Sequence, residues 1–420
     1  MEKLFVFSLN KIKQAMVLSV ALTATFSLSG CGESSSSEQG EQFGGSPQTP
    51  PTTPTQFNQK ALLESVANNV ILPTYKLFAD NTVSLSAAIS GYCDAQRASS
   101  NDTASWKTQS QQQWQDAMVT WQMAEMMQIG PLLENNSNLR NKIYSWPNTS
   151  SCAVDQDVVL SEQADYDIAT RTVSRKGLDA LEYLLFNDTL DHSCTSFGSE
   201  PVGWDARTDE QKVQARCAYA EKVAADLTIQ AQVLLNAWEG DDNSGYKNIF
   251  INAGEPGNAF TDAQAAVNDI SDAMFYIDSA TKDAKLAAPL GIIANDCGLS
   301  VCPENVESPY AQHSLQNITA NIKALNLLFK GGESSDAVGF DDYLVDVGDS
   351  DTALQMTADL TQALEYAQSL QNTLTHLLEN NPDSARTLHG EVKDVTDKMK
   401  ADFIQSLSLE LPATSAGDND

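Results

Sequence analysis

The chain has 420 residues, of which 42% are hydrophobic and 19% are charged, so it is long enough for two globular domains of ordinary composition. Its 56 acidic residues against 25 basic ones give a formal net charge of −31. This balance excludes nucleic acid as a partner, because phosphates are bound by Lys and Arg, and it favours the attraction of cations, including metal ions. Solubility alone would also explain the acidity.

Residues 1–30 have the pattern of a secretory signal peptide. Lysines precede an apolar run that is too short to span a bilayer as a mature helix. The run ends in Leu28-Ser29-Gly30-Cys31, which resembles the cleavage site of bacterial lipoproteins. Cleavage there would leave Cys31 to carry several lipid chains, enough for stable attachment to a lipid bilayer. Gly32-Glu33 lacks the Asp that often signals retention in the inner membrane, so we predict an outer-membrane lipoprotein that faces the periplasm or the cell surface.

Residues 31–56 are expected to form the lipidated cysteine and a disordered tether. They are rich in Ser, Gly and Pro and contain no periodic apolar residues, so they cannot bury enough surface to offset the entropy of ordering. The polar tail at residues 412–420 is expected to be disordered in the same way.

Between residues 57 and 411 apolar residues recur with the helical period, and alternating strand patterns are nearly absent. In chain order, the apolar stripes run from Leu62 to Phe78, Trp114 to Trp121, Val173 to Leu184, Val213 to Leu234, Val267 to Ile277, Ile318 to Phe329, Leu360 to Leu377 and Leu388 to Phe403. We therefore predict an all-α protein of two tandem antiparallel helical bundles. A polar, glycine-rich stretch places the division between bundles at residues 57–245 and 246–411, and a diverged duplication remains open.

Three local signals predict where helices begin. Thr208 and Thr261 each precede a Gln by three residues, the spacing of a capping box. Ser308-Pro309 combines a capping residue with a proline in the first turn, which is a favoured helix start.

Six cysteines remain after Cys31, an even number that in an exported protein predicts three disulfides. Six cysteines allow 15 connectivities, and pairing neighbours in sequence is the simplest choice. A thiolate metal site is the alternative, but the sequence contains no Cys-x-x-Cys pair. The predicted disulfides are Cys93–Cys152, Cys194–Cys217 and Cys297–Cys302.

Several segments in succession carry a family resemblance. They are Trp114 to Glu125 followed by Gly130-Pro131-Leu132, Ile143 to Pro147, Lys176 to Phe186, Lys285 to Gly291, and Glu307 to Ser314. Their order and spacing resemble the imelysin-like family of bacterial exported proteins. The resemblance implies two helical bundles, a periplasmic or cell-surface setting and a role associated with iron uptake. Some members of the family have been described as metallopeptidases.

The sequence departs from the family at its Gly-x-His-x-x-Glu motif, which here reads Gly177-x-Asp179-x-x-Glu182. Residues three apart share a helix face, so the two carboxylates can enter one pocket and hold a hard cation or share a proton. Without an imidazole they make a poor zinc-peptidase site. The alternative is an acidic pair on a solvated edge that meets Arg171 or Arg175.

Glu125 is predicted to be a third member of this site. It continues the stripe of Trp114 and Trp121 by helical spacing and should therefore face the interior. A carboxylate among tryptophans is costly unless it is paired or binds a metal. The alternative is that its charge reaches solvent at the end of the bundle.

His376-Leu-Leu-Glu379 imitates a His-x-x-Glu motif, but His376 lies away from the apolar stripe and is predicted to be a surface residue. The other histidines have no metal-binding spacing, and no known hydrolase constellation is present. The sequence therefore yields no catalytic residues.

Three functions follow from these observations. The favoured one is a non-enzymatic lipoprotein of iron acquisition that binds a divalent or ferric metal ion, a metal chelate or an outer-membrane receptor. The candidate metal ligands are Asp179, Glu182 and Glu125. The alternatives are a metallopeptidase that uses Glu182 and a partner-binding scaffold whose site has decayed.

Overall fold

The computed structural model describes residues 57–195, 199–241, 244–412 and 415. Within these residues the regular elements are helices, apart from one isolated bridge between Asn295 and Gly298. The prediction of an all-α protein is confirmed. No helix in this described part is both long and apolar enough to cross a membrane. The predicted signal peptide, Cys31, the tether and most of the predicted tail lie outside the described residues.

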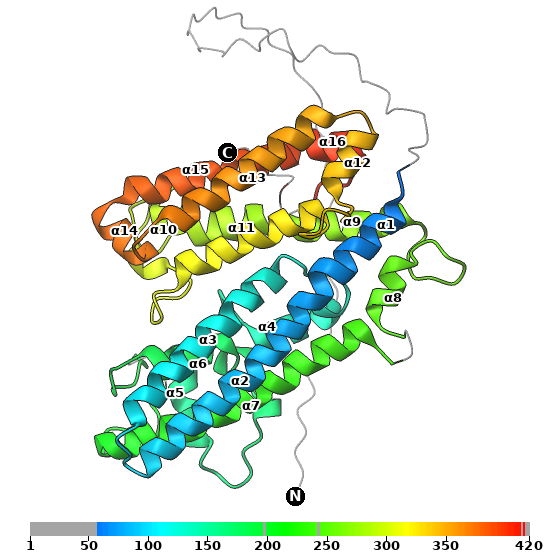
Figure 1. Ribbon diagram of the computed structural model, residues 1–420. Helices are drawn as coiled ribbons and strands as arrows, with labels where there is room; N and C mark the ends of the chain where they lie inside the picture. The colour runs from blue at the N-terminus through cyan, green and yellow to red at the C-terminus, as the bar shows by residue number, and fades with distance from the viewer. Residues whose placement is uncertain (1–56, 196–198, 242–243, 413–414, 416–420) are drawn as a thin grey trace, which may run out of the picture. The chain divides into compact units, whose positions relative to one another are not determined.

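The N-terminal half is built on three long helices that pack side by side (Figure 1). Its helices are α1 (Gln59–Val66), α2 (Leu72–Arg97), α3 (Thr103–Glu125), α4 (Glu134–Ile143), α5 (Ser151–Leu160), α6 (Leu178–Phe186), α7 (Asp209–Glu239) and α8 (Tyr246–Ile251). A π-helical turn, η1 (Ala67–Ile71), joins α1 to α2, so the chain remains helical through Pro73. Short 3₁₀ turns occupy Gly130–Leu132, Ile168–Thr170 and Val173–Arg175.

The C-terminal half packs α13 against both α11 and α15. Its elements are α9 (Ala263–Met274), the π-helical η5 (Ile277–Ala287), α10 (Ala288–Leu290), the 3₁₀ turn η6 (Pro303–Asn305), α11 (Ser314–Lys330), α12 (Phe340–Asp346), α13 (Ser350–Ser369), α14 (Leu374–Asn380), α15 (Pro382–Lys398), the π-helical η7 (Met399–Phe403) and α16 (Ile404–Leu407). α3 packs against α11 and α1 against α9, so one apolar core continues through both halves. The residue boundary between domains and the duplication remain predictions.

Of the three predicted helix starts, one is confirmed. Thr208 and Gln211 form the capping box of α7. The start at Thr261 is wrong by one residue, because Asp262 accepts the capping hydrogen bond. The start at Ser308-Pro309 is also wrong, since α11 begins only at Ser314. The residues between Pro309 and Ser314 form a turn instead. Backbone N–H groups of this turn donate to a carboxylate of the other half, as described below.

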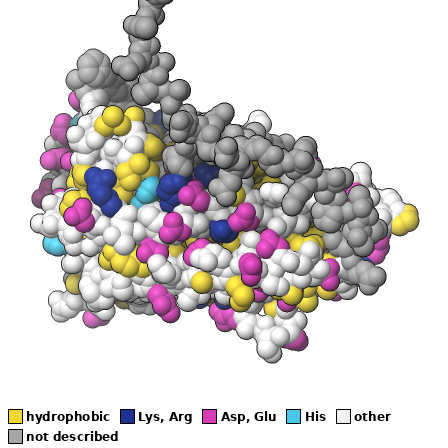
Figure 2. All heavy atoms as spheres, turned by 90° about the horizontal axis from the view of Figure 1, so that it is seen from above, with side chains coloured by type: hydrophobic (Ala, Val, Ile, Leu, Met, Phe, Trp, Pro, Cys, Tyr) yellow, Lys and Arg dark blue, Asp and Glu magenta, His cyan; other side chains and the backbone are white. Residues whose placement is uncertain are grey.

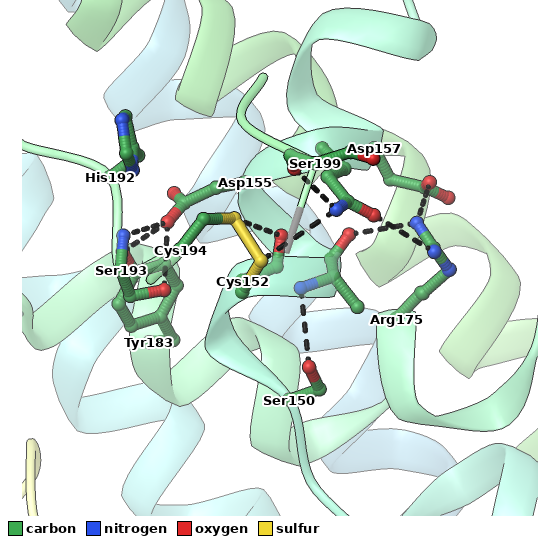
Figure 3. Close-up of a disulfide and its surroundings, with 12 residues drawn as sticks. Ser150, Cys152, Asp155, Asp157, Arg175, Tyr183, His192, Ser193, Cys194 and Ser199 are labelled. Atoms are coloured by element: carbon green, nitrogen blue, oxygen red, sulfur yellow. Dashed lines mark hydrogen bonds and ion pairs between the residues drawn. A yellow bond between two sulfur atoms is a disulfide. The ribbon is translucent and has the colours of Figure 1, made fainter. Parts of the chain in front are cut away.

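The structure contains three disulfides, and two of the predicted pairings are wrong. Cys93 pairs with Cys217, because α2 and α7 run antiparallel and bring distant parts of the chain together. Cys152 at the start of α5 pairs with Cys194, which follows α6 (Figure 3). The third pair is Cys297 with Cys302. Pairing cysteines by their proximity in sequence failed because Cys93 and Cys217 lie inside long helices. There, the packing of the helices decides which cysteines meet, and the number of residues between them does not.

We expect all six of these cysteines to be oxidised in the exported protein. Mass spectrometry of non-reduced peptides should find the Cys93–Cys217, Cys152–Cys194 and Cys297–Cys302 cross-links and only trace alkylation. Removing Cys93–Cys217 by double serine substitution should lower the free energy of unfolding by ~2–5 kcal/mol, as is typical of native disulfides. Stoichiometric alkylation of any pair would contradict this disulfide assignment.

Candidate cation site

The helix that carries the motif, α6, follows a position that only glycine fits. Gly177 has a φ of +89°, and a Cβ at this residue would lie 2.6 Å from the carbonyl oxygen of Ile143. Asp179 lies in the first turn of α6 and Glu182 lies about one turn later. Both carboxylates therefore leave the helix on one side, as the spacing predicts.

Asp179 is held by Ser145. The backbone N–H of Ser145 donates to Oδ1 at 3.3 Å, and its hydroxyl donates to Oδ2 at 2.8 Å. Burial raises the pKa of Asp179 to about 6, although both hydrogen bonds favour the ionised form. Arg171 and Arg175 do not supply the partners of a solvated edge, because both guanidinium groups bind Asp157.

Glu182 is almost completely buried and is held by backbone from the other half of the protein. Its Oε1 accepts the N–H groups of Tyr310 at 2.9 Å and Ala311 at 3.0 Å. Burial raises the pKa of Glu182 to about 8, and the negative charges of Glu307 and Asp179 act in the same direction. A nearby positive charge would stabilise the ionised form of this carboxyl group and lower its pKa.

Glu307 is the site residue that the sequence did not identify. It precedes α11 and is 4% exposed. Its Oε1 accepts hydrogen bonds from Gln122 at 2.9 Å and Tyr144 at 3.0 Å, and its Oε2 accepts one from Asn317 at 2.9 Å. The ammonium of Lys285 lies 3.1 Å from Oε1. Glu307 is the first residue of the segment Glu307 to Ser314, which is one of the segments that carry the family resemblance. Its place in that segment was the sequence signal that could have identified it.

The three carboxylates line one small cavity of about 40 Å³. The lining residues are Thr149, Ser150, Ser151, Val154, Asp179, Ala180, Glu182, Tyr183, Glu307, Pro309 and Tyr310. This volume holds an ion or a few water molecules, because a single water needs roughly 10–15 Å³. Ser150 and Ser151 directly precede Cys152, whose disulfide with Cys194 ties this part of the lining to the segment after α6. On the molecular face in Figure 2, by contrast, acidic side chains are spread among other residues and are not gathered in one patch.

Glu125 faces the interior, as predicted, and is completely buried. Its carboxylate binds Arg140 at 2.9 Å, the hydroxyl of Tyr276 at 2.7 Å and Lys285 at 3.3 Å. These partners satisfy the charge, and Glu125 is not among the described residues that line the cavity. The structure therefore brings the two motif carboxylates together with Glu307, and Glu125 belongs to an adjoining buried ion-pair network.

Among the described residues, Asp179, Glu182 and Glu307 do not place three ligand atoms within 4.8 Å of one another, whereas two groups elsewhere do. The groups are Cys297, Cys302 and Glu304, and His192, Glu200 and Asp205. The first offers no thiolates, because both cysteines form a disulfide. The second is largely exposed, with acidic groups that are common on surfaces without a metal. His376, the residue of the imitation motif, is exposed as predicted.

The raised pKa of Glu182 predicts how the stability of the metal-free protein depends on pH. Its folded-state pKa of about 8 exceeds the ordinary value of 4.5, so the folded protein binds this proton more tightly. The resulting stabilisation is complete below the unfolded pKa and is lost as the pH rises through about 8. Glu182→Gln removes this titration while keeping an oxygen acceptor. In chelator, urea unfolding should show Glu182→Gln gaining stability relative to the parent as the pH rises, and a pH-independent difference would contradict the assignment.

The fold places this chain in the class of all-α proteins. A family profile described as Peptidase_M75: Imelysin matches residues 71–400. The chain therefore belongs to the imelysin family. No curated protein matches the chain closely enough to count as a relative.

Solved structures show the same fold. An imelysin-like protein from Psychrobacter arcticum superposes with a TM-score of 0.63 at 18% identity, covering 84% of this chain and 96% of the other. A protein from Parabacteroides distasonis, described provisionally as an iron-regulated protein A precursor, gives a TM-score of 0.64 at 16% identity with the same coverages. At these identities the likeness establishes the fold alone.

Proposed function

We propose that this imelysin-family protein is an exported, lipid-anchored component of iron acquisition that binds one metal cation in the acidic cavity without catalysis. The observation that carries the proposal is that Asp179, Glu182 and Glu307 all line one cavity of about 40 Å³. Burial raises the pKa of both motif carboxyl groups, so a bound cation would relieve a real electrostatic cost.

The donor set fits a hard cation. Three carboxylate residues line the cavity together with Ser150 and Ser151, and oxygen ligands suit ions such as manganese and magnesium. No histidine is among the described lining residues, so the set suits zinc poorly and lacks the ligands of a zinc peptidase. When bound, the cation would supply the positive charge that allows the buried carboxylates to ionise.

The size of the cavity favours a bare ion over an iron chelate. Small-molecule sites usually enclose about 300–1,000 Å³, several times the space available here. The link to iron rests on family membership and on the iron-regulated description of the Parabacteroides distasonis protein. A receptor in the outer membrane is a further predicted partner.

Manganese binding tests the proposed site, because Mn²⁺ prefers oxygen ligands and reports its own binding by electron paramagnetic resonance. The titration should be run above about pH 8, where Glu182 is ionised, and at physiological ionic strength to screen the acidic surface. We expect one specific site in the parent and an affinity at least about tenfold lower in Glu182→Gln. Glu379→Gln, an exposed substitution in the imitation motif, is the matched control and should bind as the parent does. Equal binding by all three proteins would refute the site.

The lipid anchor is tested separately, because Cys31 lies outside the described residues. Cys31→Ser should leave the export signal intact but abolish lipid attachment, since serine lacks the thiol that carries the first lipid. The variant should accumulate as a precursor or a soluble species. Membrane association that still requires detergent would rule out the lipoprotein assignment.

A further inference from the structure

Another cavity lies along α11, apart from the acidic one. Its volume is about 370 Å³, within the range of about 300–1,000 Å³ that is usual for small-molecule sites. The described residues that line the acidic cavity share no member with the lining of this one. The lining residues, here called the α11 groove, are Val119, Met123, Leu315, Gln316, Thr319, Ala320, Lys323, Ala367, Gln368 and Leu370.

The α11 groove is left open by small side chains where three helices meet. α11 lies between α3 and α13 and packs against both of them (Figure 1). Near the middle of the groove, α11 carries Thr319 and Ala320, and α13 contributes Ala367. Side chains of this size fill little of the space between helices, so room remains along α11 for another group.

The walls of the α11 groove are apolar and partly accessible. Val119 and Met123 of α3 and Leu370 of α13 are each partly exposed. An apolar group that entered the groove would remove this surface from water, which is favourable. Met123 also brings a flexible, polarisable side chain, which adapts to the shape of a bound group.

Hydrogen-bond donors lie at the rim of the groove. Lys323, Gln316 and Gln368 are exposed, and within the described part of the chain their side chains form no hydrogen bond or ion pair. Gln316 and Lys323 are two turns apart and therefore share one face of α11. The ammonium of Lys323 is thus available to an anion that lies in the groove.

The charge of the groove differs from that of the chain as a whole. Its described lining contains one Lys and no Asp or Glu, whereas the full sequence has 56 acidic and 25 basic residues. The acidic cavity, by contrast, is lined by three carboxylate residues. An anion therefore suits the α11 groove, because no carboxylate of the lining competes for Lys323 or repels the bound group.

We propose that the α11 groove binds an apolar carboxylate, such as a medium-chain fatty acid, with its chain between α3 and α13 and its carboxylate at Lys323. The apolar walls would bury the chain, and the ammonium would select the charge of the head group. This site is independent of the proposed cation site, so either one stands without the other.

Isothermal titration calorimetry with decanoate, decanol and decylamine tests this assignment. The titrations should be run near neutral pH, where the carboxylic acid is ionised, and below the concentration at which decanoate forms micelles. We expect one saturable site for decanoate in the parent, with a negative heat-capacity change from the burial of apolar surface. Decanol and decylamine should bind more weakly, because neither carries a negative charge.

Three variants locate the ligand. Lys323→Met should weaken decanoate binding by at least about threefold and leave decanol binding unchanged, since only the head-group contact is lost. Thr319→Phe should weaken both ligands by at least about tenfold, because the ring occupies the groove. Lys222→Met is the matched control, since Lys222 is exposed on α7 and has no ion pair among the described residues. Lys323 is exposed as well, so Lys323→Met keeps the test decisive if Thr319→Phe does not fold.

Several results would overturn the assignment. Equal binding of decanoate by the parent and a folded Thr319→Phe would place the ligand outside the groove. Decylamine binding as tight as that of decanoate, or unchanged decanoate binding by Lys323→Met, would show that the groove does not select a carboxylate. If the parent binds no decanoate, the inference fails, and a parent dimer that Thr319→Phe dissociates in sedimentation would identify a second copy of the chain as the occupant.

Discussion

Lys285→Met should lower the free energy of unfolding by ~3–5 kcal/mol, the usual cost of breaking a buried ion pair. The ammonium of Lys285 is completely buried and lies 3.3 Å from Glu125 and 3.1 Å from Glu307. It also donates to Asn321 at 2.9 Å. Methionine has a similar length but no charge, so the substitution leaves two buried carboxylates short of a cation.

Urea unfolding of the parent and the variant measures this effect. Lys323→Met is the control, because Lys323 is exposed on α11, and surface substitutions usually change stability by less than about 0.5 kcal/mol. Equal losses in the two variants would mean that the Lys285 network contributes nothing specific. A cation at the site should partly restore Lys285→Met, since it would supply positive charge next to Glu307.

Asp179→His should raise the affinity for Zn²⁺ by about tenfold or more while weakening that for Mn²⁺. The substitution replaces a hard oxygen ligand by an imidazole nitrogen, which suits zinc better. The side chain would lie beside Glu182 on the same face of α6. The substitution removes the carboxylate that accepts the two hydrogen bonds from Ser145, so we also expect some loss of stability.

Competition between Zn²⁺ and Mn²⁺ in equilibrium dialysis measures the selectivity. Asp351→His adds a histidine at an exposed acidic position of α13 and controls for general zinc binding by the surface. If Asp179→His gains no more zinc affinity than Asp351→His, residue 179 does not contribute a ligand to a metal in the cavity. The alternative of a partner-binding scaffold would then be favoured.

The apolar periodicity was sufficient to predict the fold class, because each long helix buries one stripe against its neighbours. It also predicted that Glu125 points inward. The apolar stripe of α3 did not reveal which positively charged side chains would pair with this carboxylate, because Arg140 and Lys285 come from other elements. Burial follows from local spacing, whereas the choice of partner depends on how the helices pack.

The dependence of side-chain partners on helix packing also explains why two disulfides were mispaired and why Glu307 was missed. Cys93 and Cys217 are 124 residues apart and meet only because α2 and α7 are antiparallel. Glu307 lines the same cavity as the motif carboxylates because residues 307–311 do not belong to α11, which begins only at Ser314. Ser308-Pro309 favours a helix start locally, but Glu182 instead binds the N–H groups of the turn. This tertiary contact overrides the local preference.

The central claim is that the cavity lined by Asp179, Glu182 and Glu307 holds one cation. Crystals of the protein grown above about pH 8 with Mn²⁺, where Glu182 is ionised, would test it by anomalous diffraction. The account predicts one strong anomalous peak in the cavity, within bonding distance of an oxygen from at least one of the motif carboxylates. A cavity without a peak at a manganese concentration that saturates the protein in solution would contradict it.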